Sequence, residues 1–309
     1  GCGEERGEVD PPENGHLRGI GLMVVVMAAF AIEDSFIKRA ADDMPTGQIL
    51  LMLGVFGAAI FTVMAARAGQ KPFSRDLLQG QVMLRNLGEV IGTMGFVTAI
   101  ALTPLTSATA ILQAMPLAVT LGAALFLGES VGWRRWTAIL VGFAGVLVII
   151  RPGLEGFDIN SLWAVLAVFG LAIRDLATRR VPARIGSMSI SVSGFVSVAI
   201  LGGAMLALSG GAVWPGTLQT ALMVGALSAG VVGYWMVVEA MRVGEISAVT
   251  PFRYARLILA LIIGILIFGE RPDLMTLAGA TLVIGSGLYT FARERVRRRN
   301  AARAEAISA

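Results

Sequence analysis

Acidic and basic residues interrupt the long apolar stretches of this 309-residue chain, and they are the residues best suited to handle a polar ligand. Glu33 and Asp34 follow the apolar run 20–32, and Arg174 and Asp175 stand 141 positions later in the same Ala-Ile-x-Asp context. A charge inside a bilayer is costly, so such a residue either pairs with another charge or serves a polar path. At about 1.5 Å per residue, Asp34 and Asp175 lie toward opposite mouths, and we expect both, with Arg174, to act as gates. The alternative is that the first helix ends near residue 32 and leaves Glu33 and Asp34 among the lipid headgroups.

Three further charged residues, Arg253, Arg256 and Glu89, are expected near mid-depth of their helices. A guanidinium can replace the water around a carboxylate with two parallel charge-assisted hydrogen bonds. Arg253 and Arg256 are therefore predicted to bind an anionic group of a substrate, with Glu89 beside them. The alternative is purely structural: Glu89 and Arg256 would pair across the bundle. Arg85, one turn before Glu89, would contribute little on its own.

Two local breaks are predicted in the helices around these charges. Gln113 with Pro116, and separately Pro251, are placed to interrupt their helices and free backbone carbonyls toward a cavity. Gln113 is therefore a candidate substrate-binding residue. Aromatic side chains in membrane helices more often serve packing or the lipid interface, but three are candidates for lining the cavity: Trp163, Tyr234 and Tyr254.

The elements that must position these residues are membrane-spanning helices. Hydrophobic residues make up 56% of the chain and charged residues 15%, and the apolar runs do not alternate as barrel strands would. The prediction is an all-α integral membrane protein with ten transmembrane helices. Gly88-x-x-x-Gly92 has the spacing for close helix packing. The predicted spans are 17–38, 46–67, 80–101, 106–127, 133–151, 160–180, 187–209, 217–241, 246–268 and 274–293.

Metal and acid–base chemistry are poorly supported by the composition. The chain has one cysteine, Cys2, and one histidine, His16, which excludes an intrachain disulfide, a Cys/His metal site and a histidine base within the membrane. No metal site, cofactor or catalytic residue is predicted, and the chain is not expected to be an enzyme. A membrane-embedded transferase would need a catalytic acid–base set and a sizeable polar loop, and a channel would need a filter or a ring of charges. The sequence shows none of these features, so neither class is favoured.

The 141-residue offset extends beyond one tetrapeptide and predicts two copies of one unit. Each copy holds five helices, so the second must enter the membrane from the opposite side. Such inverted repeats are typical of secondary transporters, with the substrate site between the halves. The two repeats are predicted at 17–151 and 160–293, and the glutamates of the paired Gly-Glu motifs are expected to be structural residues at helix ends. The matching pairs are Gly128-Glu129 with Gly269-Glu270, Ile91-Gly92 with Val232-Gly233, and Lys38-Arg39 with Arg179-Arg180.

Charge also predicts the orientation. Residues 1–16 are acidic, with two prolines and no apolar core, so a disordered segment is expected there and not a signal peptide. One set of alternate loops, together with the basic tail 294–309, carries most of the Lys and Arg residues, which predicts that both termini are cytoplasmic. The basic residues thus reflect topology and anionic lipid contact, and not nucleic-acid binding. The other set of loops carries only Lys38, Arg39, Arg151 and Arg271.

Two long motifs resemble a known family. "MPLAVTLGAALFLGE", beginning at Met115, and "LILALIIGILIFGERPDLMTLAGATLVIGSGLY", beginning at Leu257, are similar to the helix-four and helix-nine motifs of EamA-type members of the drug/metabolite transporter superfamily. The likeness runs from residue 17 to about 293. Members of that family export amino acids and other metabolites, or take up cofactors and nucleotide-like compounds. "TPFRYARL", beginning at Thr250, resembles the helix-nine start of relatives that import riboflavin or S-adenosylmethionine.

The resemblance and the repeat together predict a secondary transporter of the bacterial-type inner membrane, working by alternating access. The absence of an ATP-binding P-loop means that concentrative transport would depend on a gradient. Export of amino acids or related small polar metabolites is the first expectation, and uptake of a cofactor such as riboflavin or S-adenosylmethionine is the alternative. The expected partners are the small-molecule substrate and the lipid bilayer, and the expected state is a monomer.

Overall fold

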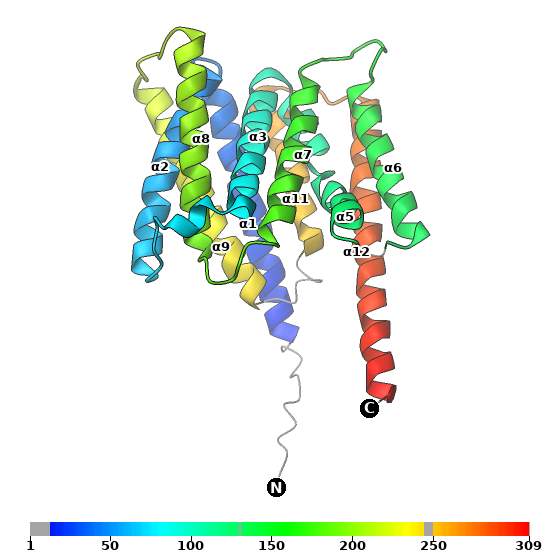
Figure 1. Ribbon diagram of the computed structural model, residues 1–309. Helices are drawn as coiled ribbons and strands as arrows, with labels where there is room; N and C mark the ends of the chain where they lie inside the picture. Colours follow the sequence, from blue (N-terminus) through cyan, green and yellow to red (C-terminus); the bar gives the residue numbers. More distant parts are fainter. Residues whose placement is uncertain (1–12, 130, 244–249, 309) are drawn as a thin grey trace.

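The computed structural model describes residues 13–129, 131–243 and 250–308, and within these ranges it consists of helices and short connections (Figure 1). The predicted spans appear as single helices, except for the fourth and the ninth. The elements are α1 (Glu13–Ala40), α2 (Thr46–Arg67), η1 (Arg75–Leu78), α3 (Gly80–Leu102), α4 (Leu105–Leu112), α5 (Met115–Phe126), α6 (Trp133–Ile150), α7 (Ser161–Thr178), α8 (Ser187–Ser209), α9 (Thr217–Val243), η2 (Thr250–Tyr254), α11 (Ala255–Phe268) and α12 (Leu274–Ser308).

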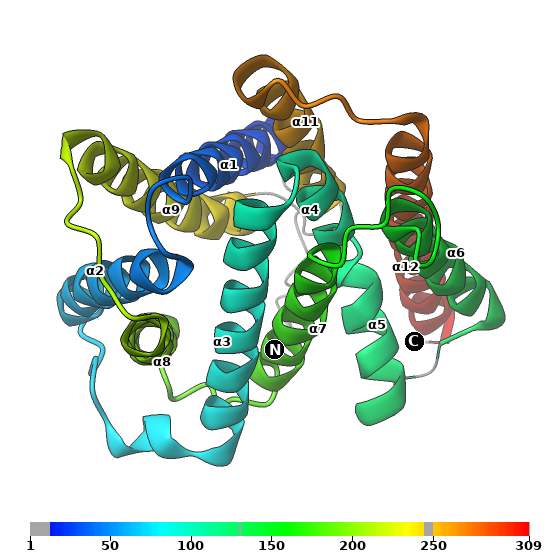
Figure 2. The same ribbon diagram turned by 90° about the horizontal axis from the view of Figure 1, so that it is seen from above.

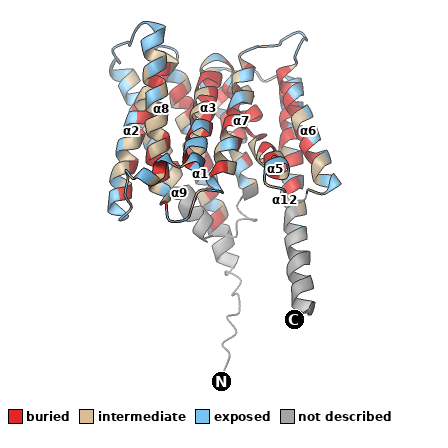
Figure 3. Ribbon diagram, viewed as in Figure 1, coloured by how far each residue is buried: buried red, intermediate tan, exposed pale blue. Residues whose placement is uncertain are grey.

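The helices are suited to a membrane. Within the described ranges, nine stretches are long and apolar enough to cross a bilayer. The tenth helix of the bundle is α3, which carries Arg85, Asn86 and Glu89. Buried residues run through the middle of the bundle and exposed ones lie on its outside (Figure 3). Large apolar side chains such as Phe56, Leu140 and Ile200 are among those exposed, as expected for a surface that faces lipid.

The predicted breaks in the fourth and ninth spans are confirmed. The fourth span is divided into α4 and α5 at Gln113 and Ala114. Met115 and Pro116 are the first two residues of α5. The ninth begins with the 3₁₀ turn η2, which contains Pro251, and continues as α11. Proline has no amide hydrogen to donate to the preceding turn, which accounts for both interruptions.

Both ends of the described chain are helical. Helix α1 begins at Glu13, so residues 13–16 are helical and were wrongly assigned to the disordered segment, whereas residues 1–12 lie outside the described part of the chain. At the other end α12 continues as one helix through the predicted tail to Ser308. The repeat boundaries at 17–151 and 160–293 stay predictions.

The arrangement of helices has the symmetry expected of two inverted repeats. The most extensive contacts are α2 with α8, α3 with α7, α1 with α9 and α6 with α12, and each joins one repeat to the other (Figure 2). If each helix is replaced by its equivalent in the other repeat, the α1–α9 pair becomes the α7–α3 pair. The α2–α8 and α6–α12 pairs stay the same. Helices α1 and α7, which begin the two repeats, run in opposite directions (Figure 1). The predicted fold class is therefore confirmed.

The two ends of the bundle carry different sets of connections. We call the end where α1 begins and α12 ends the terminal face, and the opposite end the far face (Figure 1). The connections after α1, α3, α6 and α11 lie at the far face. Those after α5 and α7 lie at the terminal face.

Glycines allow the paired helices to approach closely. A Cβ atom on Gly170 of α7 would lie 2.4 Å from the backbone nitrogen of Gly92 on α3, and one on Gly54 of α2 would lie 2.4 Å from that of Ala199 on α8. A Cβ on Gly279 of α12 would lie 2.5 Å from the carbonyl oxygen of Gly145 on α6. Close backbone approach of this kind is how helices associate in lipid. The predicted role of the Gly88-x-x-x-Gly92 spacing is confirmed at the α3–α7 interface.

Gly170→Ala is expected to destabilise the protein, because the added methyl group would meet backbone atoms that cannot rotate away. Overpacking of this kind costs about 1–3 kcal/mol. Thermal unfolding in detergent measures the effect, and Gly80→Ala is the matched control because nothing lies within 4 Å of a Cβ at that position. Equal melting temperatures for the two variants would contradict the close packing of α3 and α7.

Candidate functional site

A buried ion pair joins the two halves of the bundle. Asp34 on α1 is 2% exposed and accepts two hydrogen bonds from Arg256 on α11, one from Nε at 2.9 Å and one from Nη2 at 2.7 Å. The guanidinium carbon lies 5.4 Å from the ring centre of Phe30 and 5.2 Å from that of Phe96. Two parallel bonds with aromatic contacts are the geometry in which an arginine is held most firmly. The pair therefore fixes α1 against the start of α11.

The structure corrects the alternative in which Glu89 pairs with Arg256. Glu89 instead binds Arg85 and Arg174, while Arg256 binds Asp34. Glu89 and Arg256 were expected at similar depth in the membrane, but α11 packs mainly against α1 and α4. Arg256 meets α3 at Phe96, about two turns along the helix from Glu89. A shared depth is not sufficient for contact.

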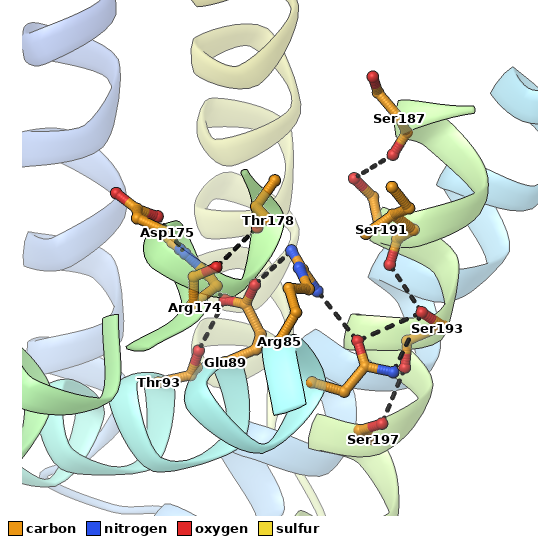
Figure 4. Close-up of polar contacts among 12 residues, drawn as sticks. Arg85, Glu89, Thr93, Arg174, Asp175, Thr178, Ser187, Ser191, Ser193 and Ser197 are labelled. Atoms are coloured by element: carbon orange, nitrogen blue, oxygen red, sulfur yellow. Dashed lines mark hydrogen bonds and ion pairs between the residues drawn. The ribbon is translucent and has the colours of Figure 1, made fainter. Parts of the chain in front are cut away.

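Glu89 is the centre of a second cluster, which lies between α3 and α7 (Figure 4). Its carboxylate lies 2.6 Å from Nη2 of Arg85 and 3.4 Å from Nη1 of Arg174, and it accepts a hydrogen bond from Thr93 at 3.3 Å. Arg174 also donates through Nε to Asp175 at 2.9 Å. Two carboxylates thus share two guanidinium groups, and the cluster is close to neutral.

A polar strip continues from this cluster onto α8 (Figure 4). Arg85 donates to Asn86 at 3.3 Å, and the Asn86 amide and the Ser193 hydroxyl are 3.1 Å apart. Ser191, two residues earlier, shares a hydrogen bond of 3.1 Å with the hydroxyl of Tyr234. Among the described residues, polar groups therefore extend from α7 across α3 to α8.

Arg253 differs from the other arginines near the centre. It is exposed, and within the described part of the chain its guanidinium has no ion pair or hydrogen bond. The carboxylate of Asp175, with a partly exposed side chain, lies within electrostatic range of it. Gln113, at the break between α4 and α5, donates a hydrogen bond to the backbone carbonyl of Arg253 at 3.3 Å. This hydrogen bond joins the two helix breaks. Arg253 is exposed and Asp175 is partly exposed, and their side chains carry opposite charges.

The predicted gates lie toward opposite ends of the bundle. Asp34 is six residues before the end of α1 at the far face, and Asp175 is three residues before the end of α7 at the terminal face. Arg174 is the repeat equivalent of Glu33, whose carboxylate lies against Gly230 of α9. Asp34 and Glu33 are inside α1, so the alternative of a helix that ends near residue 32 is wrong. The gating role itself stays a prediction.

The three aromatic candidates occupy separate places. The ring of Tyr234 is 4.6 Å from that of Phe61, edge to face. Tyr254 is buried, and its hydroxyl lies so close to Gly287 of α12 that no Cβ would fit there. Trp163 packs at the margin of the main apolar core. The structure brings none of these rings into contact with Arg253, and their substrate role stays a prediction.

Sequence reasoning missed a polar junction at the far face. Glu270, after α11, accepts hydrogen bonds from the amides of Leu105 and Thr106 at 2.5 and 3.1 Å, and from the Thr106 hydroxyl at 2.8 Å. Lys38 of α1 lies 3.9 Å from Glu270 and donates to two backbone carbonyls at the end of α3, those of Ile100 and Thr103. Glu270 therefore does cap a helix, as expected of a structural residue, but it caps α4 and not its own helix. The signal in the sequence was that a basic residue and a glutamate each recur at the 141-residue offset, as Lys38 with Arg179 and Glu129 with Glu270.

A cavity of about 350 Å³ borders this junction, between the start of α4, the end of α6 and the connection after α11. Thr106 and Glu270 are among its lining residues, and so is Arg151, which donates to Asp273 and Thr276. Hydrogen bonds from Arg151 and from the backbone amide of Thr276 lower the pKa of Asp273 to about 2. The carboxylate is therefore ionised at neutral pH, and its contact with Arg151 is lost as the pH falls toward that pKa.

A comparison of the sequence with family profiles identifies this arrangement. Residues 17–151 and 159–292 each match the profile of the EamA-like transporter family. The chain belongs to the EamA-like transporter family. Two matches in tandem also account for the exchange symmetry of the helix contacts, and they make this EamA-like transporter a multi-pass membrane protein of a bacterial transporter family.

Curated relatives agree with this assignment. An S-adenosylmethionine uptake transporter of Rickettsia conorii is 24% identical over 91% of this chain and 94% of its own length. A riboflavin transporter of Vibrio cholerae is 28% identical over 87% and 91%. A pseudopaline exporter of Pseudomonas aeruginosa is 28% identical over 86% and 93%. The relatives are named as transporters and not as enzymes, and this EamA-like chain is likewise a metabolite transporter.

Proposed function

We propose that this protein is a secondary transporter for zwitterionic metabolites, and that it exports amino acids or amino-acid derivatives across the inner membrane with both termini in the cytoplasm. The observation that carries the proposal is that Arg253 is exposed, Asp175 is partly exposed, and the two are oppositely charged groups within electrostatic range of each other. A free guanidinium is suited to bind a carboxylate, and a nearby carboxylate is suited to bind an ammonium group. An amino acid presents both groups within a few bonds of each other.

The arginines other than Arg253 support its choice by being occupied. Asp175 is occupied as well, because Arg174 binds its Oδ1, so a substrate ammonium would bind Oδ2 or displace Arg174. Arg256 donates two hydrogen bonds to Asp34, and Arg174 is shared between Glu89 and Asp175. A substrate carboxylate would have to displace Asp34 to reach the bonded nitrogens of Arg256. Among the described residues Arg253 has no such partner to displace, so it is the first candidate of the predicted pair to contact substrate.

Uptake of S-adenosylmethionine is a second candidate, because relatives that match about nine tenths of this chain are named for it. That molecule carries the same amino-acid group and would make the same contacts with Arg253 and Asp175. Riboflavin has neither a carboxylate nor an ammonium group. The direction of transport, and not the recognition of the amino-acid end, distinguishes the two zwitterion candidates.

The experiment is transport by the purified protein in proteoliposomes, with a panel of labelled amino acids, S-adenosylmethionine and riboflavin. We expect transport of the zwitterionic compounds in exchange for unlabelled compound and no transport of riboflavin. Transport of riboflavin in the absence of any movement of amino acids or S-adenosylmethionine would contradict the proposal. Outward against inward transport in intact cells then separates the export candidate from the uptake candidate.

Arg253→Gln is expected to lower the transport of these zwitterionic compounds by about 10- to 100-fold. Hydrogen bonds to a charged group contribute about 1.5–3 kcal/mol, and each 1.4 kcal/mol corresponds to about a factor of ten. Arg253→Lys is expected to retain part of the activity, because an ammonium keeps the charge but loses the paired geometry. Arg75→Gln, an exposed arginine at the terminal face, is the matched control. Equal rates for Arg253→Gln and Arg75→Gln would exclude Arg253 from the substrate path.

A further inference from the structure

We infer that a groove between α6 and α12 binds an anionic phospholipid, with the phosphate on Arg134 and one acyl chain along the apolar wall of the groove. The two helices run side by side at the edge of the bundle (Figures 1 and 2). None of the residues that line the groove belongs to the candidate functional site. Binding of the lipid therefore does not depend on which compound the protein transports.

The groove has a volume of about 340 Å³ and is lined by one face of each helix. On α6 the lining residues follow helical spacing from Trp133 to Val141, about 12 Å along the helix axis. On α12 they are Gly285, Ser286 and Tyr289. A Cβ atom on Gly285 would have no atom within 4 Å, so space remains for a ligand at that residue. The other lining residues of α6 are Arg134, Thr137 and Ala138.

Two hydroxyl groups in the wall donate back to their own helices. Thr137 donates a hydrogen bond to the carbonyl of Trp133, and Ser286 donates one to the carbonyl of Val283. Ordered water needs about two to four polar partners, so this wall favours an apolar occupant. An empty groove would forfeit the packing contacts of its wall. In a bilayer the apolar occupant at hand is an acyl chain.

The end of the groove at the terminal face has the groups expected around a lipid headgroup. Arg134 is exposed, and its guanidinium carbon lies 5.2 Å from the ring centre of Trp133. Within the described part of the chain this guanidinium has no ion pair or hydrogen bond. Trp133 and Tyr289 are 73% and 44% exposed, and such rings are typical of the lipid–water interface. Arg293 follows Tyr289 by one turn on the same face of α12.

The charge at this end favours an anionic lipid. A guanidinium binds a phosphate through two parallel hydrogen bonds, and basic residues at a membrane surface attract anionic lipids. Among the described residues, none of those lining the groove is acidic. A second copy of the chain fits less well, because a two-fold contact would place this surface against itself. Arg134 would then be buried without a counter-charge.

Native mass spectrometry of the detergent-purified protein, titrated with phosphatidylglycerol or phosphatidylcholine, tests the headgroup site. We expect one phosphatidylglycerol to bind about fivefold more tightly than phosphatidylcholine, as one basic residue at a membrane surface provides. Arg134→Gln is expected to abolish this preference by weakening the binding of phosphatidylglycerol alone. Arg67→Gln is the matched control, because Arg67 is an exposed arginine where α2 ends at the same face. It is expected to keep the preference.

Gly285→Leu tests the wall of the groove independently of charge. The leucine side chain fits the open space but cannot share it with an acyl chain, so both lipids are expected to bind about tenfold more weakly. The variant is expected to fold, because nothing lies near the added atoms and leucine favours a helix more than glycine does. A melting temperature without added lipid at or above that of the parent checks this.

Equal affinity of the parent protein for the two lipids would overturn the lipid site. An equal loss of phosphatidylglycerol binding in Arg134→Gln and Arg67→Gln would also overturn it, as would unchanged binding in Gly285→Leu. A dimer that forms without added lipid and is lost in Gly285→Leu would assign the groove to a second copy of the chain instead. Each of these results is independent of the proposed zwitterion transport.

Discussion

Asp34→Asn is expected to be among the most destabilising single substitutions in the protein. It leaves Arg256 between two aromatic rings and without the carboxylate that binds it at 2.7 and 2.9 Å. Removal of one partner from a buried ion pair costs about 3–5 kcal/mol. Thermal unfolding of the purified protein in detergent measures this loss, and transport by the variant is expected to fall with it.

The double variant Asp34→Asn, Arg256→Gln is expected to regain most of that stability, because no unpaired charge remains. Its matched control is Glu89→Gln, Arg256→Gln, which leaves Asp34, Arg85 and Arg174 with fewer partners and is expected to be less stable than either single variant. Recovery in the control but not in the first double variant would contradict the pairing seen in the structure.

Transport by the first double variant decides whether Arg256 also meets the substrate. We expect a rate within about threefold of the parent, because Arg253 remains to bind a carboxylate. A double variant that is stable yet inactive would show that Arg256 releases Asp34 during transport and binds the substrate directly.

Glu89→Gln is expected to have the second largest effect on stability, again about 3–5 kcal/mol. It removes the shared anion of Arg85 and Arg174. Among the described residues, Arg174 would keep Asp175, whereas Arg85 would keep a single hydrogen bond, of 3.3 Å, to Asn86. The same detergent unfolding experiment applies, with Glu155→Gln in the exposed connection after α6 as the control.

A second substitution on α3, at Arg85, is expected to compensate for the loss of the Glu89 charge. Arg85→Met combined with Glu89→Gln is expected to restore most of the lost stability, because the remaining Arg174–Asp175 pair is neutral. Full stability of Glu89→Gln alone would mean that water, and not Glu89, neutralises Arg85.

Features that depend on local chemistry were predictable from the sequence. The helix breaks followed from Gln113, Pro116 and Pro251, because proline disrupts a helix wherever it falls in the interior. The two-repeat architecture followed from the 141-residue offset and an odd number of helices. The close packing at Gly92 followed from the spacing of small residues.

Partner choice among the charges was not predictable by the same means. Asp34 and Arg256 are 222 residues apart, and their contact depends on how α1 and α11 are placed and rotated. The offset reports which positions are equivalent, and equivalent positions need not touch. Lys38 and Glu270 show the converse: their equivalents were recognised, but contact between the end of one helix and the end of another requires the tertiary structure.

The long separation of Asp34 from Arg256 also affects how the chain is made. Ribosomes add about 5–20 residues per second, so α1 would leave the ribosome about 10–45 s before its partner arginine does. Throughout that interval the aspartate cannot be neutralised by the residue that neutralises it in the finished protein. Early α1 must therefore wait in the insertion machinery, at the lipid–water boundary or with a proton on Asp34. Maturation of the first half thus depends on translation of the second.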